Sequence, residues 1–252
     1  MNKKDWLNKC LEWKSKWPVP QEQGDKLNDD SNGINLYKFY EVLNQNLKED
    51  SIVTWDAGSS LYVSNQALRL NGKNQRSIGS LAQAEMGAGI AMSCGVSFAK
   101  NKGEVICCIG DGSLNTQVHS LAIARKLNLP IKIFVLNNRG YLSIKNSQDK
   151  FYEGRRIGTD SNDGLFFPEI EKLASAYDFF YYRVDKIIDL DYIIKKALKF
   201  NFPSIIEVIC QEIQEISPGI TATKNADGKL EQCDFSNMSP FIEGIENEMI
   251  KD

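Results

Sequence analysis

Two short polar segments, each directly after an apolar run, have the residue types and spacing to do chemistry. Residues 110–113 (GDGS) follow the run EVICCI, and residues 137–138 (NN) follow the run IKIFVL. Glycines let the backbone come close to a ligand, and a helix beginning near Ser113 directs free N–H groups to the same place, which suits phosphate. Asp111 and Asn138 offer hard oxygen ligands, which suit Mg²⁺ or Ca²⁺. The two segments therefore predict a metal-bridged diphosphate site.

The elements around these segments must bring them together. Both apolar runs are typical of parallel strands covered on two faces, and the residues between them predict a helix, which gives one β-α-β unit. We also expect a helix from residue 36, a strand at 51–56, a helix within 82–99, a helix near 168–177, a strand at 179–184, a helix at 189–200 and a strand at 204–210. This alternation predicts an α/β fold with a doubly wound, mostly parallel sheet and helices on both faces. Ligands of such sheets bind at the carboxyl ends of the strands.

Composition excludes several classes of function. The chain has 252 residues, 42% of them hydrophobic and 25% charged, with a net charge of −3, so no basic field favours nucleic acid or an anionic membrane surface. No apolar run reaches the length of a membrane helix, and the N-terminus lacks the apolar core of a secretory signal, so we expect a cytoplasmic protein. The six cysteines form no C-x-x-C pair, which favours buried small side chains over a zinc or iron–sulfur site.

The N-terminal segment carries three tryptophans. Trp6, Trp13 and Trp17 fall near one helical face, and Pro18 ends the helix. Such a face needs a burial surface, which is either the body of this chain or a second chain or domain. Residues 21–34 are polar and rich in turn formers, and are interpreted as a linker or surface loop. The predicted organisation is an N-terminal helix and linker (1–34), a cofactor-binding domain (35–215) and a C-terminal tail (216–252).

The segment GDGS at residues 110–113, followed by Asn-Asn at residues 137–138, resembles the diphosphate-binding signature of thiamine-diphosphate enzymes. The surrounding residues 129–144, LPIKIFVLNNRGYLSI, are similar to the acetolactate synthase branch in particular. The tryptophan segment, residues 164–177 and the tail from residue 217 resemble further parts of that family's C-terminal domain. The resemblance implies a six-stranded parallel sheet and thiamine diphosphate as cofactor. Similar tails occur in relatives that act in sugar or polysaccharide pathways.

The resemblance also implies roles for individual residues. Asp111, Asn138 and the backbone carbonyl of Gly140 ligate the metal, which is Mg²⁺, with Ca²⁺ or Mn²⁺ as alternatives. The residues implied to face the cofactor are Gly58, Ser59, Ser60, Ala84, Met86, Gly112, Ser113 and Tyr141. Met86 falls where the family places a bulky apolar side chain beneath the cofactor, which forces its two rings into a V. The Ala84 carbonyl and the Met86 N–H hold the aminopyrimidine edge.

Three residues depart from the family's usual pattern. His119 and Ser120 stand where a Gln-Glu pair is usual, and Glu85 stands where threonine is frequent. His119 is interpreted as a residue of the helix surface, with a site role as the alternative. The departures leave the usual acetolactate-forming substrate open, and they do not touch the metal motif.

In the family, the glutamate that activates the cofactor comes from a separate pyrimidine-binding domain, and no segment here resembles it. We therefore expect a split enzyme, a hetero-oligomer and specifically a heterotetramer, whose partner chain carries that glutamate, so the catalytic residue of this chain stays unassigned. The expected reaction is decarboxylation or carboligation of a small-molecule 2-oxo acid. Alternatives are the β subunit of a 2-oxoacid:ferredoxin oxidoreductase, a transketolase-like half, a non-catalytic cofactor-binding subunit, or a domain excised from a longer enzyme.

Residues 141–164 are polar, rich in turn formers and longer than most connections. They predict a loop that acts as a lid, mobile without cofactor or partner and ordered over the filled site. Arg155 and Arg156 are its candidates for contact with an anionic substrate, with a solvated surface role as the alternative.

Overall fold

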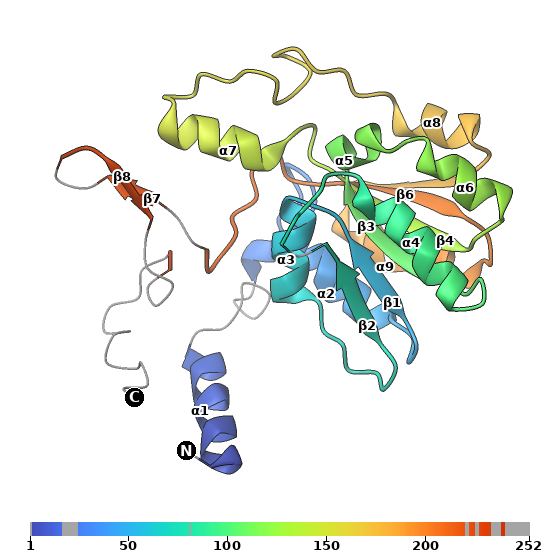
Figure 1. The fold of residues 1–252 in the computed structure, drawn as a ribbon, viewed down its shortest axis with the longest axis horizontal. Helices are drawn as coiled ribbons and strands as arrows, with labels where there is room; N and C mark the ends of the chain where they lie inside the picture. The colour runs from blue at the N-terminus through green and yellow to red at the C-terminus, as the bar shows by residue number, and fades with distance from the viewer. Residues whose placement is uncertain are drawn as a thin grey trace. The chain divides into compact units, whose positions relative to one another are not determined.

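The computed structural model describes residues 2–16, 25–80, 82–219, 222–224, 227–232 and 238–239. The chain divides into two compact units, Gly24–Gln214 and the two ends together, Met1–Gln23 with Glu215–Asp252. The first unit contains the predicted site (Figure 1). Among the helices of the described ranges, none has the length and apolar composition needed to cross a membrane.

The main unit is built on one sheet. Its strands are β1 (Ile52–Trp55), β2 (Arg76–Gly79), β3 (Val105–Gly110), β4 (Ile131–Asn137), β5 (Phe180–Val184) and β6 (Ser204–Ile209). They lie in the order β2-β1-β3-β4-β6-β5, and every neighbouring pair is parallel. The predicted doubly wound α/β fold with six parallel strands is therefore confirmed.

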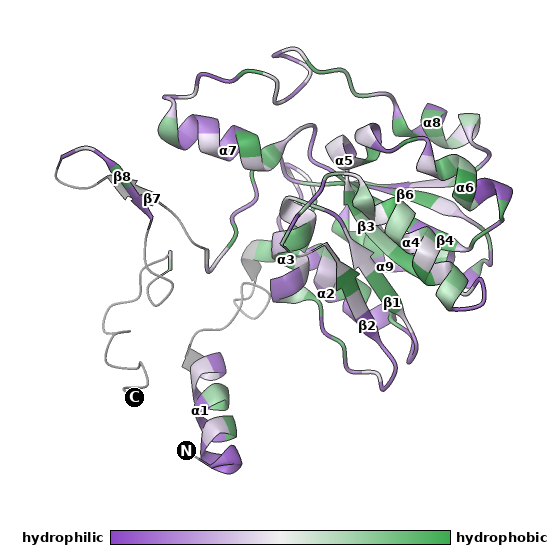
Figure 2. Ribbon diagram, viewed as in Figure 1, coloured by the Kyte–Doolittle hydropathy of each residue, from purple (hydrophilic) through white to green (hydrophobic). Residues whose placement is uncertain are grey.

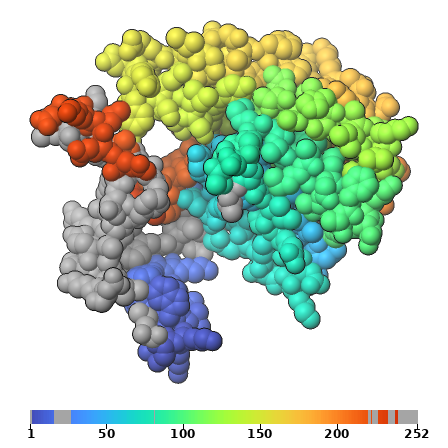
Figure 3. Space-filling view, viewed as in Figure 1, coloured from blue at the N-terminus to red at the C-terminus, as the bar shows by residue number. Residues whose placement is uncertain are grey.

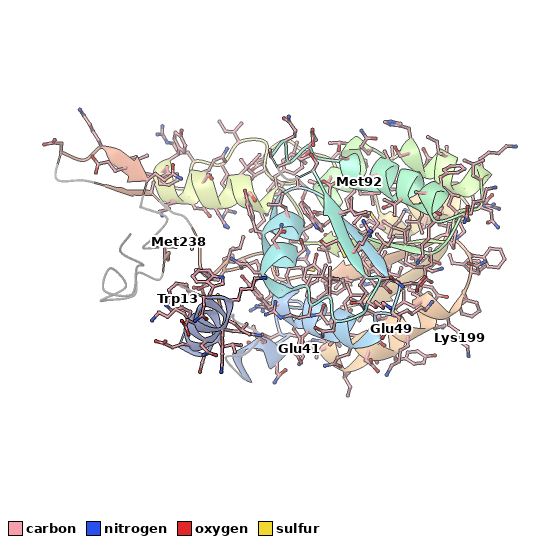
Figure 4. All side chains as sticks on the ribbon, turned by 60° about the horizontal axis from the view of Figure 1, so that its bottom comes forward. Trp13, Glu41, Glu49, Met92, Lys199 and Met238 are labelled. Atoms are coloured by element: carbon pink, nitrogen blue, oxygen red, sulfur yellow. The ribbon has the colours of Figure 1, made fainter. Side chains whose placement is uncertain are left out.

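Helices cover both faces of this sheet. In the main unit they are α2 (Leu36–Asn46), α3 (Ser59–Ala67), α4 (Ala88–Ala99), α5 (Asp111–Thr116), α6 (Ser120–Lys126), α7 (Leu142–Phe151), α8 (Ile170–Ala176) and α9 (Ile187–Lys199), with a 3₁₀ turn at Asp25–Asn28. Helices α4, α6 and α8 pack on one face, and α2, α3 and α9 lie on the other (Figure 1). Figure 4 shows this separation through Met92 of α4 and, on the opposite side, Glu41 of α2 and Lys199 of α9.

Apolar burial explains the layers. Strands β3, β4 and β6 are buried along nearly their whole length, as expected of central parallel strands. On the face of α4, α6 and α8, Ile90, Leu121 and Ala174 pack with Ile133 and Ile205 of the strands. Figure 2 shows hydrophobic residues gathered on these strands and hydrophilic ones in the loops at their ends. The predicted site residues Asp111 and Asn138 thus follow directly on buried central strands.

The strand order places a switch point between β1 and β3. From β1 the chain moves outward through α3 to β2, and from β2 it returns through α4 to β3 on the other side of β1. Because successive crossovers of one hand then lie on opposite faces, the loops after β1 and β3 diverge and leave a crevice. The segment GDGS begins at the last residue of β3 and borders this crevice.

Several sequence-based expectations need correction. The single helix predicted after GDGS is two helices, α5 and α6, separated by residues 117–119. Strand β2 and helix α3 were not predicted, because β2 is a partly exposed edge strand and α3 carries many polar residues. The segment 141–164 is not one loop, since residues 142–151 form α7. The remaining expected strands and helices fall within a few residues of their predicted places.

The segment predicted as a linker packs on the main unit over its described part. Leu27 and Ile34 are buried, and Ile34 forms a parallel bridge to Cys210 just past β6. Gly33 has φ +105°, and a Cβ there would stand 2.6 Å from the carbonyl of Cys210. A glycine is therefore needed where this segment runs beside the end of β6. The domain boundaries at residues 34 and 215 stay predictions.

The unit formed by the chain ends contains α1 (Lys3–Lys16) and an antiparallel hairpin, β7 (Ala222–Lys224) and β8 (Leu230–Gln232). The predicted N-terminal helix is confirmed, and the rings of Trp6 and Trp13 meet edge to face with centroids 5.8 Å apart. Trp17 and Pro18 lie outside the described residues.

Candidate functional site

The end of β3 places a carboxylate at the carboxyl edge of the sheet. Asp111 opens α5 and is only 7% exposed. Its Oδ1 accepts a hydrogen bond from the Gly112 N–H and its Oδ2 one from the Gly140 N–H, both at 2.9 Å. Burial raises the pKa of Asp111 to about 7, against the opposing effect of these donors. Because no basic side chain pairs with it in the described part of the chain, an added cation would stabilise its ionised form.

The end of β4 places an amide beside that carboxylate. Asn138 is 7% exposed, and its Oδ1 is buried with no hydrogen-bond donor within reach in the described structure. A buried polar atom of this kind costs free energy unless something binds it, and such atoms are rare in folded proteins. An amide oxygen is a ligand that Mg²⁺ and Ca²⁺ accept. The orphaned oxygen therefore fits a metal ion.

The turn after Asn138 is held in an unusual backbone conformation. Arg139 has φ 61° and Gly140 has φ 149°. A Cβ at Gly140 would stand 2.4 Å from the Thr159 carbonyl oxygen, which accepts a hydrogen bond from the Tyr141 N–H at 2.8 Å. The same turn brings the Tyr141 ring onto α5, where a Cβ at Gly112 would stand 2.2 Å from it. Both glycines are thus required by close approach.

The end of β1 forms the third wall of the crevice. Gly58, at φ 67°, precedes α3, so Ser59 and Ser60 form its first turn and are not a free loop. The Ser60 hydroxyl accepts a hydrogen bond from the Asp56 N–H at 2.9 Å and lies 3.0 Å from the Cys108 carbonyl oxygen. This hydroxyl is used to tie the ends of β1 and β3 together.

Asp56 is a site residue that sequence reasoning missed. Its carboxylate is buried and accepts hydrogen bonds from the N–H groups of Ala57, Gly87 and Gly89 at 2.8, 2.9 and 2.7 Å. It thereby fixes the start of α4 against the end of β1, and with it the segment that contains Met86. An aspartate directly after an apolar strand and before Ala-Gly is the signal that could have identified it.

The segment before α4 projects toward the crevice. Ala84 has φ 49°, and the Met86 side chain is 39% exposed, so Met86 is not an ordinary core methionine. Glu85 is exposed and accepts a hydrogen bond from the Ser80 hydroxyl. Its carboxylate is thus engaged within its own loop.

These walls enclose one cavity of about 200 Å³. All eleven residues expected to bind cofactor or metal line it: Gly58, Ser59, Ser60, Ala84, Met86, Asp111, Gly112, Ser113, Asn138, Gly140 and Tyr141. Neither Glu85 nor His119 belongs to the lining, and His119 lies exposed between α5 and α6. The structure therefore brings the predicted residues together, while their roles stay predictions.

The segment predicted as a lid forms a defined structure beside the cavity. It consists of helix α7 followed by an extended segment that leads back toward α8 (Figure 1). Lys145 of α7 is buried and forms an ion pair with Asp160 at 2.8 Å. On the surface, Arg156 binds Asp149 through two hydrogen bonds of 2.8 and 2.7 Å. Figure 3 shows this region, in yellow, as a continuous edge beside α5 and α6. Arg156 is thus engaged in an ion pair, and the lid's mobility stays a prediction.

Of the five cysteines in the described residues, four are buried as predicted and Cys10 is only partly buried. Cys94, Cys107, Cys108 and Cys210 are buried, and burial raises the pKa of Cys107 to about 12. No group of three or more His, Cys, Asp or Glu side chains in the described ranges could hold a metal. A site built from one carboxylate, one amide and one carbonyl does not need such a group. Cys233 lies outside the described residues.

The fold and this edge define a cofactor-binding α/β domain, and comparison with known proteins identifies its family. Residues 56–208 match the family described as thiamine pyrophosphate enzyme, C-terminal TPP binding domain. The chain belongs to this family. Thiamine pyrophosphate is another name for thiamine diphosphate. The resemblance drawn from the sequence is therefore confirmed.

Three proteins to which the chain is similar are acetolactate synthases. The acetolactate synthase large subunit of Porphyra purpurea is 26% identical over 222 residues, which cover 87% of this chain and 35% of that protein. The large subunit of Buchnera aphidicola subsp. Acyrthosiphon pisum is 30% identical over 187 residues, 74% of this chain and 31% of that protein. Acetolactate synthase 1, chloroplastic, of Zea mays is 31% identical over 139 residues, 54% and 22%. The chain spans about a third of the length of the first two.

Proposed function

We propose that this chain supplies the diphosphate-binding half of a thiamine-diphosphate site and holds the diphosphate through Mg²⁺. Asp111, Asn138 Oδ1 and the Gly140 carbonyl hold the ion, and Gly112 and Ser113 contact the diphosphate. The observation that carries the proposal is the buried, unpartnered Asn138 Oδ1 beside the buried Asp111 carboxylate. Ca²⁺ and Mn²⁺ satisfy the same oxygen ligands and are alternatives.

The chain's own residues bind and orient. When bound, thiamine diphosphate supplies the reactive carbon and the electron sink. Met86, which is 39% exposed at the cavity wall, would contact the rings of the bound cofactor, and the Ala84 carbonyl and the Met86 N–H would hold its aminopyrimidine edge. Asp56 fixes this segment through Gly87 and Gly89, so a change at Asp56 acts on orientation.

The proposed reaction is decarboxylation or carboligation of a 2-oxo acid, in a lyase or transferase. The names of the three relatives described above, all acetolactate synthases, support this class. The similarity of the C-terminal tail to relatives from sugar or polysaccharide pathways suggests such a pathway. His119 and Glu85 are exposed and lie outside the cavity lining, so they do not indicate which acceptor substrate is used.

The activating glutamate is proposed to come from a pyrimidine-binding domain on a partner chain. Of the described residues that line the cavity, Asp111 alone carries a carboxylate, and the proposal assigns it to the metal. The match to the C-terminal domain alone of longer relatives supports the need for a second domain. The heterotetrameric assembly and the cytoplasmic location stay predictions.

Calorimetry tests the metal assignment. Thiamine diphosphate is titrated into the chain with and without Mg²⁺, using wild type, Asn138→Ala and the control Asn201→Ala. Asn201 is exposed at the opposite edge of the sheet. We expect Mg²⁺-dependent binding that Asn138→Ala weakens by at least about tenfold, as losses at metal-site residues do, and that Asn201→Ala leaves unchanged. Equal binding by the two variants rejects the assignment.

Proton exchange tests the need for a partner. The exchange of the thiazolium C2 proton into deuterated water is followed with the chain alone. We expect the rate of the free cofactor, because a missing general base costs about 10²–10⁴-fold or more. Addition of a chain with a pyrimidine-binding domain should restore fast exchange. Enzyme-like exchange by the chain alone contradicts the split arrangement and makes Glu85 the first candidate for the activating acid.

A further inference from the structure

A chain of polar side chains lies behind the metal-binding turn, on the face of the sheet that α4, α6 and α8 cover. Glu207 of β6 is paired in register with Val135 of β4 and with Arg183 of β5. Since side chains alternate between faces, Asn137 and Tyr181, each two residues from these partners, lie on the same face as Glu207. The strand register, not the sequence separation, brings them together.

Glu207 is the centre of this chain of side chains. It is 5% exposed. Its Oε1 accepts a hydrogen bond from Asn137 Nδ2 at 2.6 Å, and its Oε2 accepts one from the Tyr181 hydroxyl and lies 3.8 Å from an Arg183 guanidinium nitrogen. Together with Asn137, Tyr181 and Arg183 it lines a second cavity, of about 340 Å³. Holding a carboxylate at such low exposure costs desolvation free energy that an apolar side chain would not. The cost calls for a reason other than stability.

Asn137 connects this carboxylate to the turn. Its Oδ1 accepts a hydrogen bond from the Arg139 N–H at 3.0 Å, while its Nδ2 donates to Glu207. Both polar atoms of the amide are therefore hydrogen-bonded. The amide group fits in one orientation only, because the carboxylate needs a donor and the backbone N–H needs an acceptor. Arg139 and Gly140 adopt positive φ directly after it, a conformation that needs support from its surroundings. The amide of Asn137 supplies that support from behind.

We propose that Glu207, held by Tyr181, is a positioning residue that acts through Asn137 to set the turn presenting Asn138 and the Gly140 carbonyl to the metal ion. The proposal rests on the metal-site function proposed above. It assigns adjacent residues to opposite tasks: both polar atoms of Asn137 are hydrogen-bonded within the protein, and Asn138 has an oxygen left free at the cofactor cavity.

Amide hydrogen exchange of the unloaded chain tests the proposal without cofactor or activity. Glu207→Ala removes the acceptor of Asn137, and Ile205→Ala makes a comparable cavity on the same strand and face without touching the turn. We expect Glu207→Ala to speed exchange of the Arg139 and Gly140 amides by about tenfold or more relative to Ile205→Ala at matched global stability. Equal rates in the two variants overturn the proposal.

A donor–acceptor swap provides the second test, read as the dissociation constant for Mg²⁺ and thiamine diphosphate. Asn137→Asp sets two carboxylates against each other and should weaken binding by about 10–100-fold, as outer partners of metal ligands do. Glu207→Gln alone keeps an acceptor for Asn137 and should stay within about threefold. The double variant restores a donor facing an acceptor and should recover most of the loss.

The outcomes separate the two proposals. Absence of Mg²⁺-dependent binding by wild type rejects the proposed function, while the exchange experiment still decides the role of Glu207. Binding by wild type with no recovery in the Asn137→Asp/Glu207→Gln double variant rejects the positioning role and leaves the metal assignment in place. A loss in Glu207→Gln as large as that in Asn137→Asp also overturns the geometric account.

Discussion

The two ends of strand β4 treat a buried polar side chain in opposite ways. At the amino end, Lys132 is fully buried and its Nζ donates hydrogen bonds to the carbonyls of Phe200 and Phe202. Just past the carboxyl end, Asn138 is almost as buried, but its Oδ1 has no partner in the described structure. A buried polar group with hydrogen-bond partners thus lies at one end of β4, and a buried polar atom without a partner lies just past the other end.

The difference separates structure from function. A buried donor with its acceptors in place contributes to the fold and gains nothing from a ligand. A buried acceptor left open costs free energy in the free protein and regains it when a ligand binds. Burial and polarity alone therefore do not identify a site, whereas incomplete hydrogen bonding at the carboxyl edge of a parallel sheet does. Changes at the two ends should have separable effects.

The largest expected effect is at the carboxyl end. Asp111→Ala should weaken Mg²⁺-dependent binding of thiamine diphosphate by at least about 100-fold, because it removes the charged ligand and outer partners alone are worth 10–100-fold. Calorimetry with and without Mg²⁺ measures this. Ser147→Ala, on the exposed side of α7, serves as the control and should bind as wild type does. Binding by Asp111→Ala within twofold of wild type removes the distinction between the two ends.

The carboxyl-end residues were predictable from sequence, because each follows an apolar run and the runs flank a single crossover. Gly112 and Gly140 were foreseeable as close-approach positions only in type, since the Tyr141 ring and the Thr159 carbonyl that require them come from other segments. The placement of Asp111 and Asn138 at one edge follows from parallel strand order, which alternation of strands and helices predicts well.

Other features depended on tertiary contacts that no local pattern contains. Strand β2 pairs only with β1 and is half exposed, so it lacks an apolar run. Helix α7 has the Ser, Asn and Asp content of a loop, and one of its two buried residues is Lys145, which pairs with Asp160. The contact of Glu207 with Asn137 and Tyr181 needs the register of three strands. Local composition favoured turns where long-range pairing decided otherwise.

At the amino end the expected effect is on stability alone. Burial lowers the pKa of Lys132 from 10.5 to about 8. Between these values the unfolded chain holds a proton that the folded chain releases, so rising pH favours the folded state there. The unfolding free energy of wild type should thus rise by up to about 3 kcal/mol relative to Lys132→Met as pH increases from 8 to 10.

Denaturant unfolding of both proteins across this pH range measures the effect, and calorimetry at pH 7.5 checks that Lys132→Met binds cofactor within about twofold of wild type. If the unfolding free energies of the two proteins depend on pH in the same way, the lowered pKa of Lys132 is refuted. Weakened cofactor binding in the variant shows that the amino end is coupled to the site.

A smaller effect is expected at the rim of the cavity. Met86→Ala should leave the affinity for Mg²⁺ and cofactor within about threefold but lower turnover roughly tenfold, since it removes a shape constraint felt by the reactive conformer. Steady-state kinetics of the chain assembled with a pyrimidine-binding domain measures this. Met92→Ala, on α4 and outside the cavity lining, is the control with the same atoms removed. Unchanged turnover in Met86→Ala, at full cofactor occupancy, argues that Met86 does not shape the cofactor.

The smallest effect is expected in the segment beside the carboxyl end. Asp149→Asn breaks the ion pair between Asp149 and Arg156. Both side chains are about 40% exposed, so the unfolding free energy should change little. Thermolysin cleavage within residues 152–163 should nevertheless accelerate two- to threefold, because the pair ties this segment to α7. Lys145 and Asp160 anchor the other end and stay in place.

Mg²⁺ and thiamine diphosphate should slow cleavage in wild type if the segment orders over the filled site. Equal cleavage with and without cofactor, in both proteins, identifies a fixed wall of the cavity in place of a lid.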